Sequence, residues 1–282
     1  MASTATTLEV TDLTARIGSQ FRVDKQVLLS GAASREIRAL LVARGVVMMR
    51  DIDLTDEEHR RLAGTLGEVR LGTFKKEGED GLMKVTQDEK VNPEYAKFFF
   101  GSLMWHMDGH YEEVPPFATV VRPRVLPPES HTDFANTYAA YEDLSDEDKA
   151  LVEGLTVVHT MQSALFPAKP DCTVEEFALW ASYPERAHPL VWHHRSGRKS
   201  LILSTSGAWI PGLHKVESAE LLQRLMRHAT QPRYVYRHTW RPNDLLLWDN
   251  TGTMHRARPH DPAHARVLAR FTLNGEEPIR AA

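Results

Sequence analysis

The stretch "LLLWDNTGTMHRARPHDPAHARVLARFTL" (residues 245–273) holds two apolar segments joined by a turn-rich connection. Their length and their aliphatic and aromatic content predict two buried strands. The connection carries His255, and the second segment carries Arg266 and Arg270, four residues apart and therefore on one side of a strand. A guanidinium inside a β-rich core is costly unless an anion meets it. The pair indicates an anion-binding site, and the solvent face of an edge strand is the alternative.

Further short strands are expected on both sides of this stretch, and helices lie between them. Strands outnumber helices in the second half without strict βαβ alternation, which favours a sandwich, jelly roll or barrel over a doubly wound sheet. No repeat or linker divides the chain, so one domain over residues 1–282 is expected. The expected strands are 46–52, 117–125, 155–161, 188–194, 200–204, 233–240, 244–250 and 267–273; the expected helices are 34–45, 54–67, 139–155, 173–183 and 218–230.

Composition excludes several classes of protein. A chain of 282 residues with 42% hydrophobic content can bury a substantial core. The net charge is -4 and no basic block is present, so nucleic acid is not expected as a partner. Cys172 is the single cysteine and cannot form an internal disulfide. No signal sequence and no membrane-spanning stretch are recognised, and a soluble, cytoplasmic protein is expected.

A second stretch, "LMWHMDGHY" (103–111), places a histidine and a carboxylate at positions i and i+2. On a strand, His106 and Asp108 point to the same face. Two imidazoles and one carboxylate form the facial triad of non-haem Fe(II) oxygenases, and His255 offers the second imidazole. The chain has 14 histidines, however, and His131-Thr132-Asp133 repeats the pattern. The motif alone is therefore weak evidence, and a hydrogen-bonded loop pair remains an alternative.

Taken together, the motifs resemble the taurine dioxygenase and 2,4-dichlorophenoxyacetate dioxygenase (TauD/TfdA) family of Fe(II)- and 2-oxoglutarate-dependent oxygenases. The matching pieces are "WHMD", the prolines of "EEVPPFATVV", and "WDNTGTMHRA" with Arg266 eleven residues after His255. The opening helix, strand and helix also look like that family. The resemblance covers most of the chain and implies an α+β, mainly β fold with a double-stranded β-helix (jelly-roll) core and flanking helices.

The resemblance also implies roles for individual residues. His106, Asp108 and His255 look like the iron ligands. Thr132 and Arg266 stand where the family binds the distal carboxylate of 2-oxoglutarate. Since Thr132 then belongs to the co-substrate site, its neighbours His131 and Asp133 are interpreted as loop residues rather than as a second metal motif.

Substrate recognition is assigned to Arg270, His110 and Tyr111. Arg270 matches an arginine that receives an anionic group in several family members, so a carboxylate or sulfonate substrate is expected. Two departures put taurine itself in doubt: Met104 replaces a polar amide, and Gly72-Thr73 stands near the place of a substrate-binding histidine. The resemblance also implies a homodimer or homotetramer, because family members often form such oligomers.

The implied activity is hydroxylation of a small organic molecule with consumption of 2-oxoglutarate and O2 and release of succinate and CO2. Cleavage of a C–O, C–N or C–S bond follows where hydroxylation lands beside the heteroatom. Three alternatives stay open: desaturation, epoxidation or ring closure on the same scaffold in a biosynthetic pathway, a non-catalytic jelly-roll metal-binding or sensor protein, and a zinc hydrolase. The zinc alternative lacks a His-Glu-x-x-His cluster.

Overall fold

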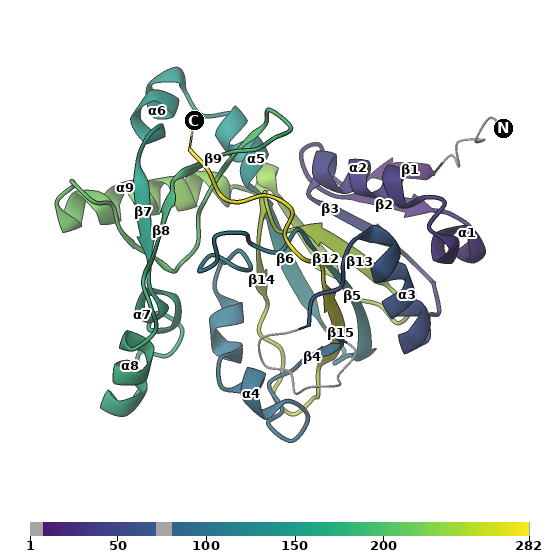
Figure 1. Ribbon diagram of the computed structural model, residues 1–282. Helices are drawn as coiled ribbons and strands as arrows, with labels where there is room; N and C mark the ends of the chain where they lie inside the picture. Colours follow the sequence, from purple (N-terminus) through teal and green to yellow (C-terminus); the bar gives the residue numbers. More distant parts are fainter. Residues whose placement is uncertain (1–7, 72–80, 282) are drawn as a thin grey trace.

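The largest sheet runs through the centre of the molecule (Figure 1). The computed structural model describes residues 8–71 and 81–281, and within them this sheet has seven strands, of which β2 and β3 are parallel and the other neighbours antiparallel. In spatial order they are β1 (Glu9–Asp12), β2 (Ser19–Arg22), β3 (Val46–Met49), β13 (Leu245–Asp249), β5 (Ala118–Val125), β15 (Val267–Thr272) and β4 (Met83–Val85).

A smaller antiparallel sheet faces the large one, and two further small sheets lie beyond it. The facing sheet has the order β12 (Val235–Thr239), β6 (His131–Asn136), β14 (Thr253–Ala257). The outer strands are β11 (Gly207–Trp209), β7 (Thr156–His159) and β8 (Arg186–Pro189) in one sheet, and β10 (Lys199–Leu201) and β9 (Val191–His193) in the other.

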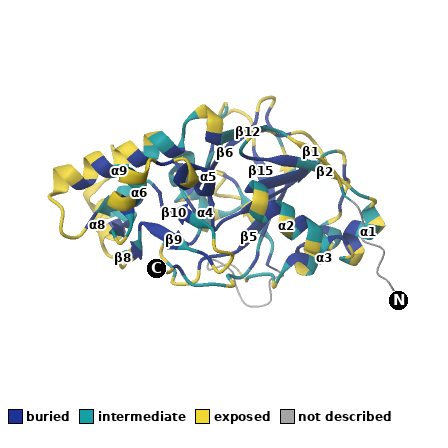
Figure 2. Cartoon of the chain, turned by 90° about the horizontal axis from the view of Figure 1, so that it is seen from above, coloured by how far each residue is buried: buried dark blue, intermediate teal, exposed yellow. Residues whose placement is uncertain are grey.

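Helices cover the outer surfaces of these sheets. Exposed residues gather on the outer turns of α9, whereas β5 and β15 are mostly buried (Figure 2). The helices are α1 (Lys25–Ser30), α2 (Ser34–Arg44), α3 (Asp56–Leu66), α4 (Pro93–Ala96), α5 (Thr137–Glu142), α6 (Asp146–Val152), α7 (Met161–Leu165), α8 (Val174–Ala181) and α9 (Lys215–Ala229), with 3-10 turns η1 (Phe99–Leu103) and η2 (Pro232–Tyr234).

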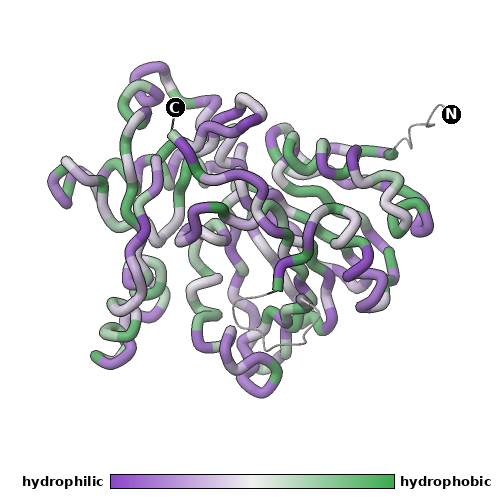
Figure 3. Tube along the Cα trace, viewed as in Figure 1, coloured by the Kyte–Doolittle hydropathy of each residue, from purple (hydrophilic) through white to green (hydrophobic). Residues whose placement is uncertain are grey.

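Helix α3 shows how the local sequence sets these boundaries. Thr55 and Glu58 form a reciprocal capping box, and the first turn is acidic, as the helix dipole favours. Hydrophilic and hydrophobic residues alternate along α2 and α3 (Figure 3). Their apolar residues, among them Leu41 and Leu62, pack on one face of the large sheet.

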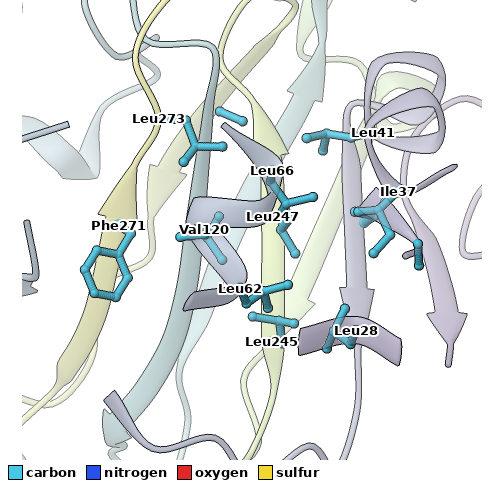
Figure 4. Close-up of a cluster of buried hydrophobic side chains, with 14 of the residues drawn as sticks. Leu28, Ile37, Leu41, Leu62, Leu66, Val120, Leu245, Leu247, Phe271 and Leu273 are labelled. Atoms are coloured by element: carbon cyan, nitrogen blue, oxygen red, sulfur yellow. The ribbon is translucent and has the colours of Figure 1, made fainter. Parts of the chain in front are cut away.

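Strand β13 is buried on both faces, which explains its uninterrupted apolar run. Leu245 and Leu247 join the core beneath α1–α3 (Figure 4). Leu246 and Trp248 point the other way and pack with Phe134 of β6 in a second core between the two facing sheets. Successive side chains of a strand alternate between faces, so one strand contributes to both cores.

The expected α+β class is confirmed by these mixed sheets and their helices, and most expected elements are present. Two of the expected elements are each divided into two in the structure. The expected strand 188–194 forms β8 and β9, because the chain changes partner from β7 to β10 near Leu190. The expected helix 139–155 becomes α5 and α6, because Ser145 caps a new helix.

The interpretation of His131 and Asp133 as loop residues is wrong. Both lie in the central strand β6, which pairs with β12 and β14. Asp133 is buried and forms ion pairs with Arg237 and Arg256. Among the helices in the described part of the chain, none is long and apolar enough to cross a membrane.

Candidate metal centre

Two histidines lie side by side where the 103–111 segment meets strand β14. His106 and His255 exchange a pair of backbone hydrogen bonds of 3.0 and 2.8 Å, and their ring centroids are 4.2 Å apart. The segment around His106 is otherwise irregular, so its expected strand is reduced to this bridge. Asp108 lies two residues further on, and the ligand atoms of the three side chains are all within 4.8 Å of one another. The sequence-predicted triad is therefore brought together.

The protonation of the two imidazoles suits metal binding. His106 Nδ1 lies 2.8 Å from the carbonyl oxygen of Met104, so this nitrogen is the donor and Nε2 keeps its lone pair. Burial lowers the pKa of His106, and lowers that of His255 well below its usual value. Neutral imidazoles with a carboxylate provide the donor set that divalent iron accepts. Met104 therefore contributes its backbone carbonyl to the site.

Asp108 is held by Arg270. Arg270 Nη2 donates to Asp108 Oδ2 at 2.6 Å, while Nε donates to Thr272 at 3.1 Å. Burial raises the pKa of Asp108, but the charge of Arg270 outweighs burial and lowers it to about 2. One carboxylate oxygen thus pairs with arginine, and the other, Oδ1, lies 3.9 Å from His255 Nε2.

The turn after Asp108 requires glycine. Gly109 has a φ of +76°, and a Cβ at this position would approach Pro116 to 2.3 Å. The turn directs His110 to the cavity, where its Nδ1 lies 3.3 Å from the carbonyl oxygen of Met107. Tyr111 also lines the cavity but is 51% exposed.

Arg266 is a buried cation without an anionic partner. Its Nε donates to Ser130 at 2.8 Å and its Nη2 to Thr132 at 3.1 Å. The Trp240 indole nitrogen also donates to Thr132, at 2.9 Å. Within residues 8–71 and 81–281, no carboxylate forms an ion pair with Arg266, and burial lowers its pKa to about 10. An uncompensated charge at this depth favours binding of an anion.

A single cavity of about 1120 Å³ contains both arginines and the triad. Every second residue from 266 to 272 lines it, which agrees with the expected placement of the two arginines on one side of the strand. These residues are Arg266, Leu268, Arg270 and Thr272. Thr132 lines it from β6, and Trp240 lies directly after β12. Gly72 and Thr73, noted in the sequence, fall outside the described residues.

Sequence reasoning missed Ser130 and Trp240. Neither belongs to a recognisable motif. Trp240 reaches Thr132 because β12 pairs with β6, and Ser130, just before β6, meets Arg266, which lies just before β15 in the other sheet. The expected strand 233–240 already includes Trp240. No pattern in the sequence indicated which side of that strand the residue would occupy.

Comparisons with known proteins agree with this geometry. The family model described as "Taurine catabolism dioxygenase TauD, TfdA family" matches residues 9–272. The (S)-phenoxypropionate/alpha-ketoglutarate-dioxygenase of Sphingobium herbicidovorans is 30% identical, over 95% of this chain and 95% of its own length. The alpha-ketoglutarate-dependent 2,4-dichlorophenoxyacetate dioxygenase of a Burkholderia species is 30% identical over 92% and 91%. The crystal structure of AAD-2 in complex with Mn(II) and N-oxalylglycine is 30% identical and superposes with a TM-score of 0.81, covering 97% of this chain and 100% of AAD-2.

Proposed function

The chain belongs to the TauD, TfdA family, and on that premise we propose that it hydroxylates a small anionic organic substrate at a centre formed by His106, Asp108 and His255. It is an Fe(II)- and 2-oxoglutarate-dependent dioxygenase, an oxidoreductase that uses O2. The observation that carries the proposal is the triad, with ligand atoms within 4.8 Å, in the same cavity as the uncompensated Arg266.

We infer that His106 and His255 bind iron through their Nε2 atoms and Asp108 through Oδ1. The hydrogen bond from His106 Nδ1 to Met104 supports this tautomer, and the pairing of Asp108 Oδ2 with Arg270 leaves Oδ1 for the metal. Fe(II) bound there would activate O2, so that one oxygen atom is used in the oxidative decarboxylation of 2-oxoglutarate to succinate and CO2 and the other hydroxylates the substrate.

We assign the distal carboxylate of 2-oxoglutarate to Arg266 and Thr132. A planar guanidinium matches a carboxylate, and pairing would offset the cost of burying Arg266. Trp240 and Ser130 are positioning residues in this proposal, because each holds Thr132 or Arg266 by a hydrogen bond. Burial of this end of the cavity excludes water from the paired charges.

Arg270, His110 and Tyr111 are proposed to contact the substrate. Arg270 is paired with Asp108 through one terminal nitrogen and with Thr272 through Nε, so its other terminal nitrogen remains for the substrate anion. Two relatives are named for acting on phenoxypropionate and 2,4-dichlorophenoxyacetate, which are organic acids with an apolar body. A carboxylate or sulfonate joined to an apolar body is therefore the substrate class proposed here.

We further propose that residues 1–282 form one dioxygenase domain and that the two facing sheets make up a double-stranded β-helix. The shared core between β13, β5 and β6 supports this arrangement. In that fold the metal residues come from the irregular segment before β5 and from β14 of the smaller sheet.

The function is tested by adding Fe(II) and 2-oxoglutarate to the protein without oxygen, then admitting oxygen with a panel of organic acids and measuring succinate. Succinate formation that requires iron and increases with one class of acid is the expected result. Bound zinc with no iron-dependent succinate would refute the proposal.

A further inference from the structure

A buried histidine on the cavity wall has no place in the chemistry described so far. His159, at the end of β7, lines the cavity and is only 2% exposed. Its Nδ1 lies 2.8 Å from Ser206 Oγ, while its Nε2 is buried and has no hydrogen-bond partner among residues 8–71 and 81–281. A polar atom left in this state destabilises the folded protein, and a ligand that pairs with it recovers that free energy.

His159 lies next to the proposed substrate residue His110, with ring centroids 5.6 Å apart. A third imidazole, His188, follows at 6.0 Å from His159. Burial is the main cause that lowers the pKa of His159 well below its usual value and that of His188 to about 4. At neutral pH these two rings are therefore uncharged and offer hydrogen bonds rather than charge.

The cavity wall on this side combines apolar and polar residues, and Arg186, which pairs with His159 between strands β7 and β8, also lines it. Phe98 and the α7 residues Met161, Ala164 and Leu165 line it, and Thr160 and Thr205 add two hydroxyls. Arg266 and Arg270 line the cavity from β15 and from the residue before it. A ligand that fits this lining has an anionic group, an apolar body and an uncharged polar atom on that body.

On the basis of the proposed function, we propose that His159 is a specificity-determining residue whose Nε2 forms a hydrogen bond with an uncharged oxygen or nitrogen on the substrate body. The substrate class narrows to organic acids whose apolar body carries a hydroxyl or carbonyl group. Ser206 holds the ring in place, so the nitrogen is oriented before the substrate binds.

The proposal is tested by binding in the absence of turnover. The protein is loaded with Mn(II) and N-oxalylglycine, and isothermal titration calorimetry gives dissociation constants for 2-phenoxypropionate and its 2-, 3- and 4-hydroxyphenoxy derivatives. The wild-type protein should bind one hydroxylated isomer about tenfold more tightly than the parent acid, as expected for one buried hydrogen bond. His159→Leu should bind that isomer and the parent equally. His159→Gln should retain part of the preference, because its amide nitrogen replaces Nε2.

A matched control is His194→Gln. His194 is also buried, but both of its nitrogens have protein partners, Glu277 at 3.0 Å and Ser200 at 2.8 Å, and it does not line the cavity. This variant should melt at a lower temperature and keep the wild-type preference.

Three results would overturn the role of His159: a preference unchanged in His159→Leu, an equal loss of affinity for all four acids, or no preference and no binding of these acids by the wild type. These measurements are made on protein already shown to form succinate with iron and 2-oxoglutarate. Absence of that succinate would instead contradict the proposed function.

Discussion

The two ends of the cavity are built differently. At the end proposed for 2-oxoglutarate, Thr132 lies in a central strand, Arg266 borders β15, and Trp240 borders β12, and all three are buried. At the end proposed for the substrate, His110 and Tyr111 lie in a turn, and Tyr111 is half exposed. Paired strands fix side chains more rigidly than turns do, so the sheet end suits an invariant co-substrate and the turn end suits a variable substrate.

The three proposed metal ligands lie in the same cavity, and loss of one of them should have the largest effect. His255→Ala removes one of three ligands, so we expect succinate formation to fall by more than the roughly 10- to 100-fold typical of residues that only orient a ligand. Iron content and succinate are measured on the same preparation. His131→Ala, in the second His-x-Asp motif, is the control and should keep both; equal losses in the two variants would remove the distinction between the motifs.

Arg266→Ala tests the rigid end. Truncating one partner of a buried charge pair costs about 2–5 kcal/mol, so the KM for 2-oxoglutarate should rise about a hundredfold or more, with iron binding unchanged. Initial rates against 2-oxoglutarate concentration give this KM. Arg237 is an exposed arginine that forms an ion pair with Asp133, and Arg237→Ala should leave the KM for 2-oxoglutarate unchanged. A wild-type KM in Arg266→Ala would contradict the assignment of this arginine.

Arg270→Ala tests the substrate end and its link to the metal. We expect turnover of anionic substrates to fall about tenfold or more, because a charged hydrogen bond is lost, while decarboxylation without substrate survives. Arg270→Lys should recover only part of the rate, since lysine has a single nitrogen in place of the two guanidinium nitrogens that bond Asp108 and Thr272. Succinate and product are measured separately for charged and neutral substrates. Equal losses for both kinds would remove Arg270 from anion recognition.

Trp240→Phe should give the smallest effect. The substitution removes one hydrogen bond to Thr132, worth about 0.5–1.5 kcal/mol, and should raise the KM for 2-oxoglutarate about fivefold. Trp192→Phe is the matched control, because in the described part of the chain the Trp192 indole nitrogen has no hydrogen-bond partner and Trp192 does not line the cavity. A larger rise in the control would show that loss of the indole ring, rather than of the hydrogen bond, causes the effect.

Patterns within a stretch of sequence and contacts between distant residues differ in how well a single sequence predicts them. The α+β class could be inferred from the order of the expected strands and helices. The set His106, Asp108, His255 and Arg266 could be inferred only from the resemblance to the family, because each motif alone left other interpretations open. The strand character of His131–Asn136 was missed because its pattern mixes charged and apolar residues, with Asp133 buried only through its arginine partners.

The contributions of Ser130, Trp240 and His159 could not be predicted, for a related reason. Each acts through a partner far along the chain: Trp240 reaches Thr132 and His159 is held by Ser206. Such contacts depend on which strands pair, and single-sequence patterns do not determine strand pairing.

The central claim is that one cavity holds Fe(II) on the triad and 2-oxoglutarate on Arg266. It is tested most directly by measuring, without oxygen, bound Fe(II) and the 2-oxoglutarate dissociation constant in the wild type, His255→Ala and Arg266→Ala. We predict an equimolar amount of iron and tight 2-oxoglutarate in the wild type, loss of iron in His255→Ala, and retained iron with weakened 2-oxoglutarate in Arg266→Ala. Retention of stoichiometric iron by His255→Ala, or wild-type 2-oxoglutarate affinity in Arg266→Ala, would contradict the account.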